Sequence, residues 1–279
     1  MITSTTRLTG LFGHPVIHSK SPQMHNAAFH HMGLDFAYLA FDVSPERLAD
    51  AVQGIRAMGL RGVNVTIPHK VEVMRFLDRI SPEAKLIGAV NTIVNENGVL
   101  TGYNTDGIGY LRSLREEVGL KLEDTTVLIL GAGGAARAIS AQMALVPVKK
   151  LLIANRTWEH AKKIAEHLRH LMEVRAIHLD EVPDVVPEID LLVNTTSLGM
   201  YPNLDQVPIH TKGIRQGMVV SDLIYNPRET RLLKEAKQKG AIIHNGIGMF
   251  VYQGAEAFTL WTGLPAPVDV MRQTVESCF

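Results

Sequence analysis

The chain reads Val127-Leu128-Ile129-Leu130-Gly131-Ala132-Gly133-Gly134-Ala135-Ala136 at the point that decides its fold. A short apolar run predicts a buried strand, and the glycines separate it from a helical pattern. Gly131, Gly133 and Ala136 satisfy G-x-G-x-x-G/A, in which the glycines allow a tight turn and close approach of a pyrophosphate. This context favours dinucleotide binding over a plain turn. The candidate cofactor-binding residues here are Gly131, Ala132, Gly133, Gly134 and Ala135.

Predicted strands and helices alternate along the chain on both sides of this stretch. The predicted strands are Thr126–Leu130, Leu151–Ala154, Asp190–Asn194, Met218–Asp222 and Ala241–His244, with helices between most of them. Strands that alternate with helices indicate a parallel sheet covered on both faces. Although Val127–Val146 approaches the length of a membrane span, its glycines favour strand, turn and helix instead.

The first third of the chain also alternates strands with helices, and Asn97-Gly98 between two β-rich runs predicts a hairpin. The predicted strands are Leu8–Phe12, Phe36–Val43 and Arg61–Ile67, and the predicted helices are Pro22–Met32, Ser44–Met58, His69–Leu77 and Asp106–Glu117. The fold class is therefore α/β, with two α/β domains, the second Rossmann-like. We expect a cleft between them, which is the natural place for a ligand.

Composition narrows the class of protein. The chain has 279 residues, with 28 basic and 28 acidic side chains, which gives no electrostatic footprint for nucleic acid or an anionic membrane. Cys278 is the one cysteine, so an internal disulfide framework and a cysteine-based zinc site are excluded. No signal peptide is expected at Met1–Leu8. We therefore expect a soluble cytoplasmic protein that binds no nucleic acid and no membrane.

The strand after the glycine turn indicates which dinucleotide binds. An NAD site expects an acidic residue about 20 residues beyond the turn, to accept from the ribose 2′-hydroxyl. Here the strand ends in Asn155-Arg156-Thr157, whose cation and neutral polar groups suit a 2′-phosphate. Alternatively, Arg156 is a solvated surface charge. The pattern favours NADP over NAD.

Two motifs in the first third suggest a substrate site. If Ser19-Lys20-Ser21-Pro22 is extended, both serine hydroxyls point the same way beside a helix start, which suits a small carboxylate. An ordinary serine cap is the alternative. In Asn64-Val65-Thr66-Ile67-Pro68-His69-Lys70, alternation puts Asn64 and Thr66 on one face and Ile67 towards the core. Lys70 is expected to start a helix at the carboxyl end of this strand.

Asp106 is the candidate partner of Lys70. It lies in Gly102-Tyr103-Asn104-Thr105-Asp106-Gly107, which links the two predicted domains. A lysine that exchanges a hydroxyl proton needs orientation, which a neighbouring carboxylate supplies. Asp106 also suits a helix N-cap. No metal site is predicted, because Pro15 separates His14 from His18 and no carboxylate or cysteine stands at ligand spacing beside them.

With these residues, the sequence closely resembles the shikimate 5-dehydrogenase family, which includes shikimate/quinate dehydrogenases. The resemblance covers nearly the whole chain in order. It includes Ser19–Pro22, Asn64–Lys70, Gly88–Thr92, Asn104–Gly107, Gly131–Ala136, Asn155–Thr157, Asn194–Met200, Asp222–Pro227, Asn245–Met249 and Gln253.

This resemblance implies reversible, metal-free reduction of 3-dehydroshikimate to shikimate with NADPH, a step of aromatic amino-acid biosynthesis. Lys70 and Asp106 match the catalytic pair. The matching substrate positions are Ser19, Ser21, Thr66, Asn91, Asp106, Tyr225 and Gln253, and the cofactor positions beyond the glycine turn are Asn155, Arg156, Thr157, Leu223, Gly246 and Met249. It also implies a substrate domain at 1–106 plus 247–279, an NADP domain at 107–246, and a monomer or homodimer.

The sequence departs from the family at His160. Many NADP-preferring members carry a second arginine there, and a histidine is a weaker phosphate partner because it is charged only when protonated. A quinate/shikimate dehydrogenase with relaxed cofactor use is one alternative. A non-catalytic NADP-binding module is the other, although Lys70 and Asp106 are both present.

Overall fold

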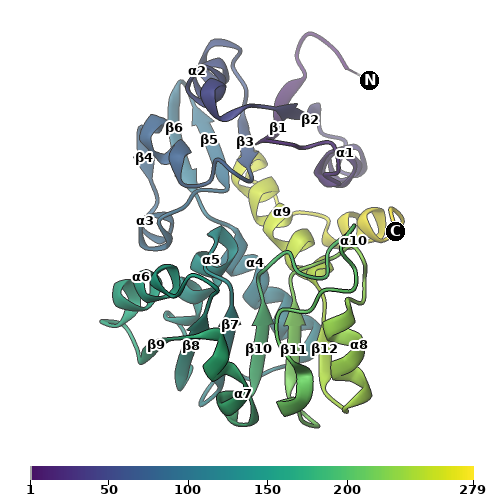
Figure 1. Cartoon of the computed structure of the whole chain (residues 1–279). Coiled ribbons are helices and arrows are strands. Elements are labelled where there is room, and N and C mark those ends of the chain that lie inside the picture. The colour runs from purple at the N-terminus through teal and green to yellow at the C-terminus, as the bar shows by residue number, and fades with distance from the viewer. Residues whose placement is uncertain (1) are drawn as a thin grey trace. The chain divides into compact units, whose positions relative to one another are not determined.

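The chain folds into two compact units (Figure 1). The structure, a computed structural model, describes residues 2–279. One unit comprises the residues up to Gly109 together with Val251–Phe279, and the other comprises Tyr110–Phe250. The chain passes from one unit to the other within helix α4 (Asp106–Ser113) and again within helix α9 (Gly246–Thr262).

The first unit contains a mixed sheet with strand order β2-β1-β3-β5-β6-β4. Strand β1 is parallel to β2 and β3, whereas β5 is antiparallel to β3 and β6. The strands are β1 (Arg7–Gly13), β2 (Phe36–Asp42), β3 (Gly62–Val65), β4 (Arg79–Ile80), β5 (Thr92–Glu96) and β6 (Val99–Tyr103). The helices are α1 (Ser21–His31), α2 (Leu48–Ala57), α3 (Pro82–Ile87) and α10 (Val268–Glu276), with 3-10 turns at Pro45–Arg47 and Glu72–Phe76.

Helical spacing explains how this sheet is covered. Leu48, Val52 and Ile55 recur on one face of α2 and pack in one apolar cluster with Val63 and Val65 of β3. The predicted hairpin is confirmed, because Glu96 pairs with Val99 and the two residues between them both have positive φ. Such a two-residue turn fixes the register of β5 against β6.

The second unit contains an all-parallel sheet in the order β12-β11-β10-β7-β8-β9 (Figure 1). In chain order this is 6-5-4-1-2-3, the order of a Rossmann sheet, and it reverses between β7 and β10. The strands are β7 (Thr126–Leu130), β8 (Lys150–Ala154), β9 (Val174–Ile177), β10 (Leu191–Asn194), β11 (Val219–Asp222) and β12 (Ile242–His244). The helices are α5 (Gly134–Met143), α6 (Trp158–Leu168), α7 (Val182–Val185) and α8 (Arg231–Gln238), with a π turn at Leu114–Val118 and 3-10 turns at Leu179–Glu181, Val186–Glu188 and Thr211–Gly213.

The structure confirms the predicted α/β class and corrects several local predictions. The helix expected at His69–Leu77 is a 3-10 turn at Glu72–Phe76, so Lys70 lies in the turn before it. Ile67 was expected to face the core, but it is 74% exposed because β3 already ends at Val65. Strands β4 and β9 and helix α3 were not predicted. No helix among residues 2–279 has the length and hydropathy needed to span a membrane.

Candidate active site

Lys70 and Asp106 form an ion pair in the first unit. Lys70 lies in the turn after β3, where its carbonyl accepts from the Val90 N–H at 2.8 Å. Its Nζ lies 2.6 Å from Asp106 Oδ2, and the two side chains are 18% and 6% exposed. Asp106 opens α4, and the Asn104 side chain accepts from its backbone N–H at 3.1 Å. The predicted pairing of the two residues is therefore present, and Lys70 keeps a path to solvent.

Asn91 anchors the other oxygen of Asp106. Its Nδ2 donates to Asp106 Oδ1 at 2.8 Å and lies 3.0 Å from Thr105 Oγ1. Its Oδ1 accepts from the Thr105 N–H at 2.8 Å. Gln253 of α9 lies beside it, with Oε1 3.5 Å from Asn91 Nδ2. The structure thus brings Lys70, Asn91, Asp106 and Gln253 together from four separate segments, and it orients both oxygens of the carboxylate.

Thr66 and the two serines lie in the same unit. Thr66 follows β3, and its N–H donates to the Phe12 carbonyl at 2.9 Å. The serine segment is not extended, because Lys20 has φ −97° and ψ 1°, so alternation does not place the two hydroxyls. Instead, Ser19 Oγ accepts from the Ser21 N–H at 3.2 Å, and Ser21, which opens α1, is buried. Ser19 thus makes a local turn bond just before α1, whose N-cap is Lys20.

The glycine turn joins β7 to α5 in the second unit. Gly131 has φ +110°, and a Cβ on it would overlap Thr195 Oγ1, so only glycine fits. Gly133 precedes α5, and a Cβ on it would meet nothing within 4 Å. The backbone there is open towards the helix N-terminus, as close approach of a pyrophosphate requires. The turn lies beside the point where the strand order reverses, so its residues fit a dinucleotide phosphate group.

The loop after β8 lies at the same sheet edge, because β7 and β8 are parallel neighbours. Asn155 Nδ2 donates to the Thr157 carbonyl at 2.8 Å, which closes the loop before α6. Arg156 and His160 are exposed, and among the described residues Arg156 has no hydrogen bond or ion pair to a side chain. The guanidinium is therefore available to bind an anion. Its exposure is equally consistent with the alternative, in which Arg156 is a solvated surface charge.

The remaining predicted residues lie in the second unit. Leu223 follows β11, and a Cβ on Gly246 would overlap the Leu223 carbonyl, so these two backbones are in close contact. Met249 lies one turn further along α9. The Tyr225 ring packs on Phe250 with centroids 5.1 Å apart, and burial raises the pKa of its phenol. The assignment of Tyr225 to the substrate, and of Leu223, Gly246 and Met249 to the nicotinamide side, stays a prediction.

The comparisons with known proteins decide the family. Three family models match along the chain: the shikimate dehydrogenase substrate binding domain at residues 11–93, shikimate / quinate 5-dehydrogenase at 113–231, and the shikimate 5'-dehydrogenase C-terminal domain at 246–276. The shikimate dehydrogenase (NADP(+)) of Geobacillus sp. (strain WCH70) is 50% identical over 269 residues, which cover 96% of this chain and 97% of the relative. The chain belongs to the shikimate dehydrogenase family.

Solved structures of shikimate dehydrogenases agree. A shikimate dehydrogenase in complex with NADP+ has a TM-score of 0.93 and 46% identity, with 100% of this chain and 97% of that chain covered. Shikimate 5-dehydrogenase from Listeria monocytogenes, in complex with shikimate and NAD, has a TM-score of 0.92 and 42% identity, with 100% of this chain and 98% of that chain covered. Quinate dehydrogenase from Corynebacterium glutamicum, in complex with NAD, has a TM-score of 0.91 and 32% identity, with 98% of this chain and 99% of that chain covered.

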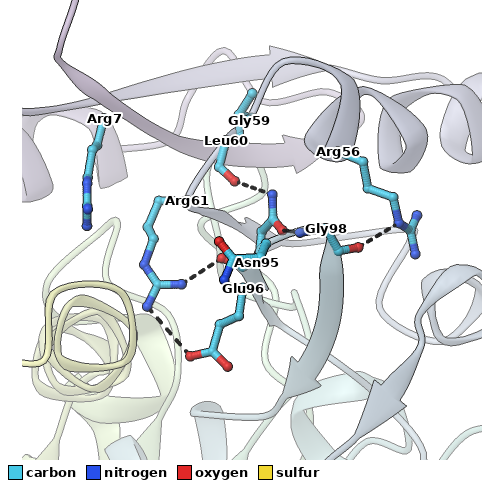
Figure 2. A pocket seen from close by; sticks show the side chains of 9 residues that line it. Arg7, Arg56, Gly59, Leu60, Arg61, Asn95, Glu96 and Gly98 are labelled. Carbon is cyan, nitrogen blue, oxygen red and sulfur yellow. Dashed lines mark hydrogen bonds and ion pairs between the residues drawn. The ribbon is translucent and has the colours of Figure 1, made fainter.

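A cavity of about 690 Å³ in this shikimate dehydrogenase family member is lined by Arg56, Arg61, Asn95 and Gly98 among others (Figure 2), and Lys70 does not line it. It is at the opposite end of β3, beside the hairpin. Arg56 Nε donates to the Gly98 carbonyl at 3.0 Å, and Arg61 Nη1 donates to the Asn95 carbonyl at 2.7 Å. Arg61 Nε also donates to the Trp261 carbonyl at 2.8 Å, so these two guanidinium groups hold the hairpin and the end of α9. We assign this cavity a structural role.

We searched the described part of the chain for side chains that could bind a metal ion. Among residues 2–279 no group of three or more histidine, cysteine, aspartate or glutamate side chains is placed to hold a metal ion. His14 has one carboxylate neighbour that the sequence did not suggest, because its Nδ1 lies 2.7 Å from Asp42 Oδ1. One imidazole and one carboxylate fall short of the ligand count of a protein metal centre.

Proposed function

We propose that the chain reversibly reduces 3-dehydroshikimate to shikimate with NADPH, and that Lys70 is the general acid–base paired with Asp106. It is an oxidoreductase that acts on a CH–OH group, and the names of its relatives support this. The reaction serves the shikimate pathway towards chorismate and aromatic amino acids. The observation that carries the proposal is the 2.6 Å contact between Lys70 Nζ and Asp106 Oδ2 in a chain of this family. We place the reaction in the cytoplasm, in keeping with a single cysteine.

Proton transfer is the part of the reaction that the chain's own residues perform. In the direction of reduction, the Lys70 ammonium donates a proton to the ketone oxygen, and hydride adds to the carbonyl carbon that bears this oxygen. In the reverse direction the neutral amine takes the hydroxyl proton. Asp106 holds Nζ in place and Asn91 holds Asp106. Such positioned proton transfer contributes roughly 100-fold to 10,000-fold in rate.

The substrate's other groups have candidate partners in both units. We assign its carboxylate to the Ser19 and Ser21 hydroxyls, and its ring hydroxyls to Thr66, Asn91, Asp106, Tyr225 and Gln253. The close grouping of Asn91, Asp106 and Gln253 with Lys70 supports this assignment. The match of residues 11–93 to a substrate binding domain supports a substrate-binding role for the first unit.

NADP binding is assigned to the second unit. The glycine turn would hold the pyrophosphate, Asn155, Arg156 and Thr157 the adenosine phosphate, and Leu223, Gly246 and Met249 the nicotinamide side. The open backbone at Gly133 and the exposed guanidinium of Arg156 support this. When bound, NADP supplies or accepts the hydride.

Quinate oxidation with NAD is the second candidate, because the quinate dehydrogenase of C. glutamicum superposes with a TM-score of 0.91. The experiment is to follow NADPH or NADH absorbance with purified protein, shikimate or quinate, and either cofactor. We expect shikimate with NADP to give the highest kcat/KM. Higher efficiency with quinate and NAD would favour the second candidate. Tight NADP binding without any turnover would identify a nucleotide-binding protein that is not an enzyme.

A further inference from the structure

Tyr38 is fully buried, and its hydroxyl bonds to Asn64 in the β3 segment that leads to Thr66 and Lys70. Tyr38 is in β2, and its hydroxyl donates to Asn64 Oδ1 at 2.8 Å. Burial raises the pKa of the phenol, so the group stays protonated and remains a donor. One hydroxyl therefore joins β2 to β3.

The Asn64 amide has a single favourable orientation, with its nitrogen towards the Asn91 carbonyl and its oxygen towards the Tyr38 hydroxyl. Its Oδ1 accepts from Tyr38, while its Nδ2 lies 3.2 Å from the Asn91 carbonyl and 3.1 Å from Thr92 Oγ1. The Thr92 hydroxyl is then free to donate to Asn91 Oδ1, at 3.0 Å. If the Asn64 amide turned over, its oxygen would face the Asn91 carbonyl, and two acceptors would oppose each other.

The network continues from Asn91 to the reacting lysine. Asn91 Nδ2 donates to Asp106 Oδ1 at 2.8 Å, and Asp106 Oδ2 accepts from Lys70 at 2.6 Å. Each of these side chains is oriented by the one before it, and all except Lys70 are buried. A change in the direction of one buried amide is therefore transmitted along the chain of bonds.

Helix α1 fixes the Tyr38 ring. The His25 imidazole stacks on the ring with centroids 4.5 Å apart and an interplanar angle of 11°. The Asn26 side chain bonds to both backbone groups of Tyr38, each at 2.9 Å. The hydroxyl position is thus set by α1, the same helix that carries Ser21.

We propose that Tyr38 is a positioning residue for the reaction of Lys70. Its hydroxyl fixes the Asn64 amide, and through Thr92 and Asn91 it aligns Asp106 on Lys70. The inference rests on the proposed function. Without the hydroxyl, Asn64 Oδ1 is buried without its donor, so the Asn64 side chain shifts and its Nδ2 loosens from the Asn91 carbonyl and Thr92 Oγ1. Asn91 then loosens its hold on Asp106.

The kinetic test is Tyr38→Phe, which removes only the hydroxyl, with Tyr110→Phe as a matched loss of another fully buried phenol. We expect kcat for shikimate oxidation to fall about tenfold in Tyr38→Phe, with the KM for NADP within about twofold of the parent. Tyr110→Phe should keep kcat within about twofold.

In an Asn64→Ala background, Tyr38→Phe should change kcat by less than about twofold. An unchanged kcat in Tyr38→Phe, or the same tenfold loss in both backgrounds, would overturn the proposal.

The structural test needs no activity. In a crystal structure of Tyr38→Phe, we expect Asn91 Nδ2 and Asp106 Oδ1 to lie beyond hydrogen-bond distance. If Asn64, Asn91 and Asp106 keep the distances of the parent, the inference is wrong. A parent protein that turns over no shikimate would reject the proposed function, while this comparison would still decide the role of Tyr38.

Discussion

Arg156 is the single residue that we propose to set the cofactor preference. It lies in the loop after β8 with an exposed side chain, and no carboxylate in Asn155-Arg156-Thr157 is available for a ribose 2′-hydroxyl. Arg156→Ala should therefore raise the KM for NADP about tenfold or more and leave the KM for NAD within about twofold, because only NADP carries the 2′-phosphate. Steady-state kinetics with both cofactors measure this.

Arg169→Ala is the control for this change, since Arg169 is also an exposed arginine of the second unit and lies at the far end of α6. It should leave both KM values unchanged. An equal rise in the KM for NADP and NAD in Arg156→Ala would point to a structural role for Arg156 instead.

Ser19 and Ser21 are expected to bind the substrate carboxylate. Loss of one hydroxyl from a neutral donor set costs about 1–3 kcal/mol, so each serine-to-alanine variant should raise the KM for shikimate roughly tenfold to a hundredfold. Because Ser19 Oγ also accepts from the Ser21 N–H, Ser19→Ala should lower stability by about 1 kcal/mol as well. Thermal melting and shikimate saturation separate the two effects. Lower stability with unchanged shikimate saturation in Ser19→Ala would show that Ser19 only stabilises the start of α1.

The glycine turn is tested at the scale of the element. Gly131→Ala should lower the melting temperature and weaken NADP binding, because its φ is +110° and its Cβ would overlap Thr195 Oγ1. Gly133→Ala should leave the melting temperature within about 1 °C, because a Cβ there meets nothing within 4 Å, yet weaken NADP binding about tenfold or more. Thermal melting and titration with NADP test both variants. Full NADP affinity in Gly133→Ala would contradict the assignment of the turn.

Local signals explain which elements could be predicted. The glycine turn and the Asn97-Gly98 hairpin depend on residues adjacent in sequence, and both are present. The 3-10 turn at Glu72–Phe76 was predicted as a helix, because its apolar residues fit helical spacing over too short a span to show where regular bonding stops. Helix α3 has six residues, with proline at its start, so its periodic signal is weak.

The candidate site was predictable where a motif names it. Lys70 was identified at the end of a strand and Asp106 in the segment that links the two predicted domains, and they form an ion pair. Tyr38 was missed because a tyrosine in a strand is an ordinary core residue by pattern, and its bond to Asn64 joins positions 26 residues apart. The prediction that Ser19-Lys20-Ser21 is extended was wrong, because the backbone turns at Lys20.

Acid sensitivity is a property of the whole molecule, and His25 contributes to it. Burial lowers the pKa of His25 from 6.5 to about 3, so the folded protein holds a neutral imidazole. Unfolded chains protonate this histidine below about pH 6.5. The stability is therefore fully present above that pH and is lost as pH falls towards about 3. By about pH 5 the loss is about 2 kcal/mol.

This loss can be measured by urea unfolding at about pH 7.5 and about pH 5. Trp261 lies with its ring 5.3 Å from His25, and the chain has one other tryptophan, so a Trp158→Phe background reports on the first unit. His25→Leu in that background should lose about 2 kcal/mol less than its parent between the two pH values. Equal losses would show that His25 titrates normally.

We propose that Lys70, held by Asp106, transfers the proton in shikimate oxidation by NADP. The most direct measurement is the rate of NADPH formation by the parent and by Lys70→Ala at saturating shikimate, with NADP affinity measured by titration on both. Loss of general acid–base help should lower kcat about 100-fold to 10,000-fold, while NADP affinity stays within about twofold. A Lys70→Ala variant that turns over within about tenfold of the parent would contradict the claim.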